Sequence, residues 1–177
     1  RSGGIAIMFS LFIFFGMYYL LFSKILYDYI FLGSLIFFVG FLDDLKIKIT
    51  PAKRLIVMIL ILFLFTYFFQ LKILHVDLIF LKSITENHFL SSIFVLLCFL
   101  FIVNGANLID GFNGMLTIHL IIINSILAYI NLENSNLEFS FIIISQIIIL
   151  LSFLLFNFPT AKIFLGDGGA YLLGSLI

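Results

Sequence analysis

Long apolar stretches separated by short polar segments run through the whole chain. Within each stretch the apolar residues are continuous and do not alternate with polar ones, which favours helices over half-buried strands. Most stretches approach the roughly 20 residues that a helix needs to cross a bilayer. They cover residues 5–22, 25–42, 55–70, 89–106, 115–131 and 137–156, and a further one starts near residue 170. The pattern predicts an all-α, polytopic membrane helical bundle with about six complete transmembrane helices and a truncated seventh.

The composition indicates that lipid is the main solvent of this chain. Hydrophobic residues make up 64% of it, charged residues 10%, and the mean hydropathy is +1.32. Soluble domains are about half apolar and a quarter charged. The net charge is zero, which disfavours nucleic acid as a partner because phosphate binding needs a basic surplus. The single cysteine, Cys98, lies in an apolar stretch and is expected to be a buried free thiol.

Alternation of the spans assigns the polar segments to two sides of the membrane. Residues 1–4, 43–54, 107–114 and 157–169 fall on one side, and residues 23–24, 71–88 and 132–136 fall on the other. The first side is predicted to be cytoplasmic, because it carries the excess of basic residues. Its basic residues are Arg1, Lys46, Lys48, Lys53, Arg54 and Lys162, against Lys24, Lys72 and Lys82 on the second side.

Aspartates on the predicted cytoplasmic side form three clusters. Asp43 and Asp44 end an apolar stretch in GFLDD, Asp110 lies in NGANLIDGFNG, and Asp167 lies in NFPTAKIFLGDGG. The glycines beside the last two let a ligand approach the backbone and leave N–H groups available to an anion. Aspartates near helix ends beside glycine-rich loops suit a hard cation that carries bound phosphates.

The middle cluster has a helical spacing. Asn104, Asn107 and Asp110 recur every three residues, so on a helix their side chains share one arc of about 120°. Polar side chains are costly against lipid. This stripe is therefore expected to face protein, water or ligand.

Each cluster also has an ordinary structural interpretation. An aspartate pair is typical of a solvated helix end, GDGG is typical of a turn, and the asparagines are typical of hydrogen bonds between helices. Three clusters on one side, separated each time by two spans, favour a shared site instead. The histidines share no metal-ligand spacing and are expected to be structural; they are His75, His88 and His119.

Four motifs in order carry a resemblance to a known family. RSGGIAI, GFLDDLKIKITPAKRL, NGANLIDGFNGM and NFPTAKIFLGDGGAYLLG resemble the polyprenyl-phosphate N-acetylhexosamine-1-phosphate transferases, an integral-membrane family (glycosyltransferase family 4) that includes WecA, TagO and MraY. The opening RSGGIAI and the LIDG tetrad are more similar to the WecA and TagO branch than to MraY. The resemblance covers essentially the whole chain.

The resemblance implies a transfer reaction at the cytoplasmic face of the bacterial inner membrane. A UDP-N-acetylhexosamine would donate its sugar-1-phosphate to undecaprenyl phosphate in the lipid bilayer, with release of UMP, to initiate a cell-envelope polysaccharide such as O-antigen or teichoic acid. Mg²⁺, with Mn²⁺ as a substitute, would neutralise the pyrophosphate and act as a Lewis acid. The resemblance also allows a homodimer.

The resemblance implies roles for individual residues. Asp167 is expected to bind Mg²⁺. One aspartate of the pair, with Asp43 favoured, is expected to orient the lipid phosphate or accept its proton, and the other to help at the metal or to bind a lysine. The catalytic residues implied are Asp43, Asp44 and Asp110, and the substrate-binding residues are Asn104, Asn107, Asn157, Phe164, Lys162 and Lys53. Phe164 is expected to touch the uracil ring. Arg54, like Lys53 and Lys162, is a candidate to attract phosphates.

The chain departs from the family pattern in two ways. Asn113 occupies a position at which the family often has a second aspartate after LIDG. The family's histidine-rich loop and an upstream segment with a lysine do not occur in the sequence. Residues 1–177 are therefore expected to form a single membrane-embedded transferase domain that lacks an N-terminal helix and loop and the C-terminal helices, and to be inactive alone.

Three other interpretations remain open at this point. An ion- or proton-coupled transporter would also place Asn and Asp among broken helices, but it predicts acids near the bilayer midplane and an internal repeat, and the sequence shows neither. A noncatalytic membrane scaffold leaves the one-sided aspartates unexplained. An MraY-type phospho-N-acetylmuramoyl-pentapeptide transferase is the alternative within the family.

Overall fold

The apolar stretches fold into helices. The computed structural model describes residues 2–45, 47, 49–69, 71 and 87–177, and no strand occurs in these ranges. The part of the chain that the structure describes therefore confirms the all-α prediction. The helices are α1 (Gly3–Phe22), α2 (Tyr27–Asp44), α3 (Pro51–Phe68), α5 (His88–Ile109), α6 (Met115–Glu133), α7 (Leu137–Asn157) and α8 (Gly166–Ser175).

Helix α3 begins four residues before the apolar stretch that predicts it. The Thr50 side chain accepts a hydrogen bond from the backbone N–H of Lys53 at 3.4 Å, and Pro51 occupies the first turn. Both residues are favoured at these positions, because the hydroxyl satisfies a free N–H and proline needs none. As a result Arg54 lies in the first turn of a helix and not in a loop.

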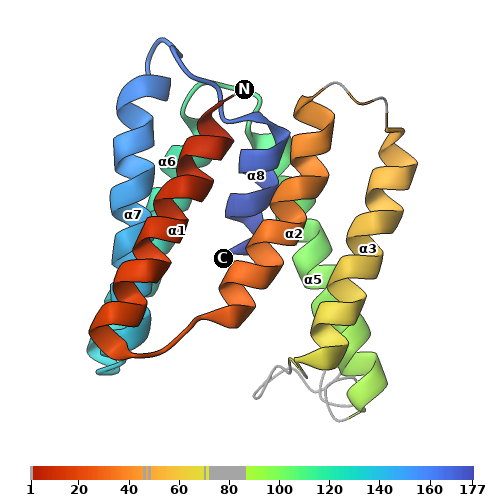
Figure 1. Cartoon of the computed structure of the whole chain (residues 1–177), viewed down its shortest axis with the longest axis horizontal. Helices are drawn as coiled ribbons and strands as arrows, with labels where there is room; N and C mark the ends of the chain where they lie inside the picture. Colours follow the sequence, from red (N-terminus) through yellow and green to blue (C-terminus); the bar gives the residue numbers. More distant parts are fainter. Residues whose placement is uncertain (1, 46, 48, 70, 72–86) are drawn as a thin grey trace.

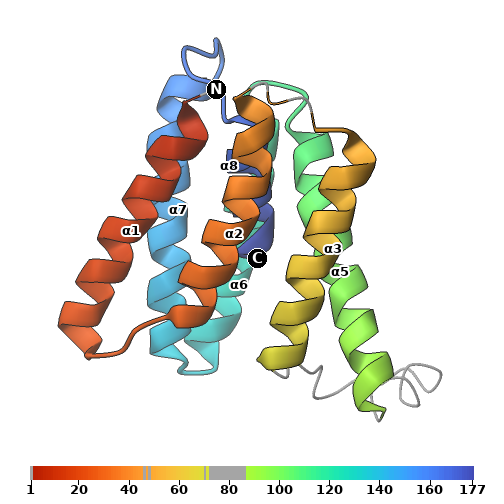
Figure 2. The same ribbon diagram turned by 45° about the vertical axis from the view of Figure 1, so that its right-hand side comes forward.

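Five of the described helices, α1, α3, α5, α6 and α7, are long and apolar enough to cross a membrane. Helix α2 has 18 residues, but it carries Asp28 in its first turn and two aspartates at its end. It nevertheless runs beside α1 and α3 through the bundle (Figures 1 and 2). Outward-facing apolar side chains such as Leu20 (79% exposed) and Leu155 (80% exposed) fit a lipid environment. The prediction of a polytopic membrane bundle is thereby confirmed.

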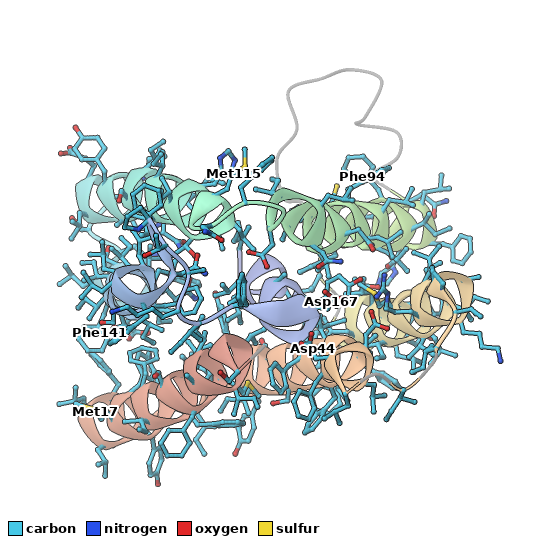
Figure 3. The ribbon with its side chains drawn as sticks, turned by 90° about the horizontal axis from the view of Figure 1, so that it is seen from above. Met17, Asp44, Phe94, Met115, Phe141 and Asp167 are labelled. Atoms are coloured by element: carbon cyan, nitrogen blue, oxygen red, sulfur yellow. The ribbon has the colours of Figure 1, made fainter. Side chains whose placement is uncertain are left out.

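Helix α8 occupies the middle of the bundle. Seen from above, α1 and α2 lie along one side of it, α5 and α6 along the other, and α7 and α3 at the two ends (Figure 3). It packs directly on α1, α2 and α5. Every residue of this ten-residue helix except Asp167 is buried. The Asp167 carboxylate is thus the one side chain of α8 that reaches partly into the open.

Glycines allow the neighbouring helices to approach α8 closely. A Cβ atom on Gly40 of α2 would lie 2.6 Å from the carbonyl carbon and oxygen of Asp167. A Cβ atom on Gly4 of α1 would lie 2.6 Å from the backbone nitrogen of Gly169. The free N–H groups of Gly3 and Gly4 donate to the carbonyls of the segment just before α8, at 3.0 and 2.9 Å. Backbone contact therefore fixes where α8 begins.

The three aspartate clusters lie at one end of the bundle, the upper end in Figure 1. The connections α2–α3, α5–α6 and α7–α8 all lie there, together with the start of α1. The predicted grouping of residues 43–54, 107–114 and 157–169 on one side is confirmed. Part of the charge count behind the cytoplasmic assignment lies outside the described residues, namely Arg1, Lys46, Lys48, Lys72 and Lys82, as does His75.

The opposite end of the bundle carries an exposed ion pair. Lys24, in the α1–α2 connection, donates to both carboxylate oxygens of Glu138 at 2.6 and 2.9 Å. This hydrogen bond, together with the negative charge of Glu138, raises the pKa of the lysine above its usual range. The cysteine Cys98 is a free thiol on α5, as expected, but it is half-buried and not fully enclosed.

Candidate active site

The carboxylate of Asp44, at the end of α2, holds the first turn of α8. Its Oδ1 accepts a hydrogen bond from the N–H of Asp167 at 3.1 Å, and its Oδ2 accepts one from the N–H of Gly168 at 3.0 Å. In the view from above, Asp44 and Asp167 lie next to each other where α2 meets α8 (Figure 3). The first N–H groups of a helix have no partner within the helix and attract negative charge. Asp44 therefore acts as a cap supplied by a different helix.

Asp43 and Asp167 share one cation. Nη1 of Arg54, in the first turn of α3, donates to Oδ2 of Asp43 at 2.6 Å and to Oδ2 of Asp167 at 3.2 Å. The side chains of the arginine and the two aspartates are 20%, 30% and 22% exposed. Partial burial makes such pairs stronger than those on an open surface. Three helices thus meet at one guanidinium group.

Tyr171 lies beneath the guanidinium group. It follows Asp167 by one turn of α8, and its ring is fully buried. The guanidinium carbon of Arg54 is 5.4 Å from the ring centroid, a distance at which a cation is attracted to an aromatic face. The tyrosine hydroxyl accepts a hydrogen bond from Nδ2 of Asn107 at 3.3 Å. The asparagine of the predicted polar stripe is therefore connected to the aspartates through Tyr171.

Asn157 joins two loops of the upper end. Its Oδ1 accepts from the N–H of Gly114 at 2.6 Å, and its Nδ2 donates to the carbonyl of Ile163 at 2.8 Å. Gly114 has a φ of +74° at the start of α6, a conformation that favours glycine. Asn113, beside it, donates to the carbonyl of Pro159 at 3.3 Å. The α5–α6 loop is thus held against the α7–α8 loop.

The arrangement of carboxylates decides what kind of metal site the chain can offer. Among the residues that the structure describes, no group of three or more His, Cys, Asp or Glu side chains is placed to hold a metal ion. Oxygens of Asp43 and Asp167 nevertheless lie within 3.2 Å of one nitrogen atom. Mg²⁺ is often bound by one or two carboxylates, with water and substrate phosphates as the other ligands. The two aspartates fit a site of that open kind.

The sequence also matches the model of a known protein family. The model described as glycosyl transferase family 4 matches residues 26–177, which is most of the chain. The chain belongs to glycosyl transferase family 4. All three aspartate clusters of this glycosyl transferase lie within the matched residues, and the resemblance stated from the four motifs is confirmed at the level of the family.

Curated relatives of this glycosyl transferase are named phospho-N-acetylmuramoyl-pentapeptide-transferase. The protein of Streptococcus sanguinis (strain SK36) is 33% identical over 153 residues, which cover 78% of this chain and 45% of the relative. That of Fervidobacterium nodosum (strain ATCC 35602 / DSM 5306 / Rt17-B1) is 30% identical over 179 residues, 99% of this chain and 56% of the relative. That of Clostridium beijerinckii (strain ATCC 51743 / NCIMB 8052) is 28% identical over 165 residues, 86% of this chain and 49% of the relative. The chain spans about half the length of these relatives.

These relatives bear on the branch within the family. The motifs RSGGIAI and LIDG led us to favour the WecA and TagO branch, and the relatives do not support that preference. Their names agree instead with the MraY-type alternative.

The structure brings part of the predicted site together. Asp43, Asp44 and Asp167 meet at the junction of α2 and α8. Asn107 is hydrogen-bonded to Tyr171, which lies beside this junction. Asn157 is buried (4% exposed), and its amide oxygen and nitrogen both bond within the protein. Its observed contacts are those of a loop anchor.

Other predicted residues lie around this junction. Nδ2 of Asn104 donates to the carbonyl of Leu100 in its own helix at 2.8 Å. Asp110 is half-buried at the end of α5. The side chains of Lys53, Lys162 and Phe164 are exposed. Their predicted substrate contacts stay predictions.

Two residues of the junction are not among the catalytic and substrate-binding residues that the resemblance implies. Arg54 is one of three basic residues expected to attract phosphates, and the structure shows that it contacts both aspartates. Tyr171 is the second. Its position four residues after Asp167 was the available signal, because residues four apart share a helix face.

Proposed function

We propose that this protein transfers a sugar-1-phosphate group from a UDP-linked donor to a polyprenyl phosphate, and that the group is phospho-N-acetylmuramoyl-pentapeptide. The observation that carries the transfer is the meeting of Asp43, Asp167 and Arg54 at one end of a membrane bundle. The names of the relatives support the choice of group. The second candidate is an N-acetylhexosamine-1-phosphate group, which the RSGGIAI and LIDG motifs favour. Membership of a transferase family argues against the ion-coupled transporter.

The proposed reaction is a phosphoryl transfer. A terminal oxygen of the lipid phosphate forms a bond to the β-phosphorus of the donor, the bond from that phosphorus to the bridging oxygen breaks, and UMP leaves with the bridging oxygen. A phosphate monoester is largely dianionic near neutral pH. The attacking oxygen therefore needs no base, and positioning and charge neutralisation supply most of the rate enhancement.

The residues of the junction have separate tasks in this proposal. Mg²⁺, bound by Asp167 and Asp43 with the donor phosphates, would supply Lewis-acid chemistry. Asp44 holds the backbone of Asp167 in place through its two hydrogen bonds and is a positioning residue. Arg54 pairs with the carboxylates of Asp43 and Asp167 and would bring a positive charge close to the reacting phosphates.

The location of the junction agrees with the two substrates. It lies at an end of the bundle, where a soluble nucleotide and a membrane-anchored phosphate can meet. Because UDP-linked sugars are cytoplasmic, we assign this end to the cytoplasmic face of a bacterial inner membrane. The larger number of basic residues in the predicted loops of this side supports the assignment.

The test compares two donors with the purified full-length protein. UDP-N-acetylmuramoyl-pentapeptide or UDP-N-acetylglucosamine is mixed with undecaprenyl phosphate and Mg²⁺, and UMP release is measured. We expect release with the first donor, loss after chelation, and a fall of at least about 100-fold in Asp167→Asn. Asp28→Asn is the matched control, because it makes the same change at the other end of α2, where Asp28 is exposed.

Three outcomes separate the alternatives. Release with UDP-N-acetylglucosamine alone would replace the pentapeptide group with the hexosamine group. Release with neither donor would refute the transfer itself. Equal losses in Asp28→Asn and Asp167→Asn would show that the upper end has no special role.

A further inference from the structure

One nitrogen atom of Arg54 fills the space between two carboxylates. Nη1 lies 2.6 Å from Oδ2 of Asp43 and 3.2 Å from Oδ2 of Asp167. The two aspartates come from α2 and α8, and the arginine comes from α3. A Mg²⁺ ion bound to the same two oxygens would lie about 2.0–2.1 Å from each of them. The guanidinium group and a metal ion would therefore be alternative partners for the same two oxygens.

The two cations differ in charge. Nη1 of Arg54 brings part of one positive charge to the carboxylates of Asp43 and Asp167, whereas a divalent ion would bring two positive charges to the same oxygens. The guanidinium group has a further partner in its present position, because its carbon is 5.4 Å from the ring of Tyr171 and cations bind to aromatic faces.

We propose that Arg54 and the divalent cation compete for the carboxylate oxygens of Asp43 and Asp167, and that the donor's pyrophosphate decides the competition by binding the released guanidinium group. The planar fork of arginine suits a phosphate group, to which it can donate two parallel hydrogen bonds. The inference rests on the proposed metal-dependent transfer and adds a regulatory step to it. Arg54 weakens metal binding until the nucleotide arrives.

The competition also predicts that the metal ion and the nucleotide bind cooperatively. A cation that displaces Arg54 without a nucleotide leaves the guanidinium group with the tyrosine ring as its neighbour. A cation that arrives with the pyrophosphate gives the guanidinium group an anionic partner at the same moment. Metal and nucleotide are therefore expected to tighten each other's binding, since a coupling free energy is reciprocal.

The experiment measures Mn²⁺ binding to the full-length protein in nanodiscs by electron paramagnetic resonance, first without nucleotide. The variant Arg54→Gln is expected to bind Mn²⁺ about tenfold more tightly than the wild type, as for a site that is open about one-tenth of the time. Arg54→Lys keeps the charge but has no fork, and its Kd is expected between the two. Lys24→Gln removes the same charge from an exposed lysine at the opposite end of the bundle and should leave the Kd within about twofold.

A second titration adds UDP as the pyrophosphate probe. UDP should tighten Mn²⁺ binding in the wild type, and the tightening should be smaller by about fivefold or more in Arg54→Gln. If Arg54 only supported the fold, Arg54→Gln would bind Mn²⁺ more weakly than the wild type, because loss of the arginine would loosen the two aspartates.

The inference is overturned if Arg54→Gln binds Mn²⁺ no more tightly than the wild type. If that variant does not fold, Arg54→Lys decides, and a Kd equal to or above the wild-type value is the contrary result. Transfer activity of the wild type is a separate measurement. Metal-dependent UMP release with an unchanged Kd in the variants would leave the proposed function standing and refute the competition alone.

Discussion

Replacing Asp44 with alanine tests whether this carboxylate is an anchor of α8. Its two oxygens accept hydrogen bonds from the N–H groups of Asp167 and Gly168. Asp44→Ala leaves both groups without this acceptor at the positive end of a helix whose other residues are buried. The whole of α8 is therefore expected to lose stability, and not only the reactivity of one carboxylate.

The expected loss is about 2 kcal/mol. An aspartate-to-alanine change at a helix N-cap costs about 0.5–2 kcal/mol, and the half-buried position and the presence of two bonds put Asp44 at the upper end of that range. Asp43→Ala is the matched control one residue earlier. It breaks an ion pair with Arg54 whose side chains are 20% and 30% exposed, but Arg54 keeps Asp167 as a partner, so we expect a loss of about 1 kcal/mol.

Thermal unfolding of the full-length protein in detergent, followed by far-ultraviolet circular dichroism, measures the difference. Asp44→Ala should lower the Tm by clearly more than Asp43→Ala, while both changes lower UMP release. An unchanged Tm in Asp44→Ala would refute the anchoring role.

Two further changes test the contacts that place α8 and its loop. Gly40→Ala should destabilise the protein by about 1–3 kcal/mol, because its Cβ would meet the α8 backbone at 2.6 Å; in Gly16→Ala, the control, nothing lies within 4 Å of the new Cβ, and a Tm drop equal to that of Gly40→Ala would contradict the close-approach argument. Asn157→Ala should cost about 1–3 kcal/mol, because it leaves the buried N–H of Gly114 without its acceptor. Faster proteolysis of the α5–α6 loop would reveal that loss, and an unchanged cleavage rate would contradict the anchoring role of Asn157.

Local sequence properties were enough to predict the membrane bundle and the grouping of the aspartates at one end of it. Continuous apolar stretches can satisfy their backbone in lipid only as helices or closed barrels, and the stretches are long enough for helices. Each complete span reverses the chain, so three polar segments separated by two spans had to return to the same end. The grouping of Asp43, Asp110 and Asp167 on one side followed from counting spans.

The tertiary structure alone decided which side chains meet. Adjacent residues of a helix point about 100° apart, so Asp43 and Asp44 face different partners, yet nothing local says that Asp44 faces α8. The bond from Gly168 to Asp44 joins residues 124 positions apart. It forms because Gly40 lets the backbones of α2 and α8 touch.

Helix packing also explains why the sequence alone did not single out Arg54 and Tyr171. Lys53 and Arg54 are equivalent as charges in a list of basic residues, and Tyr171 is one of many aromatic residues in an apolar chain. The rotation of α3 about its axis points Arg54 at the aspartates and leaves Lys53 exposed. Composition and spacing determined the kind of protein and placed the acids at one end of it. Helix packing between residues far apart in the sequence determined the partners of each acid, because the rotation and the close approach of one helix depend on all the others.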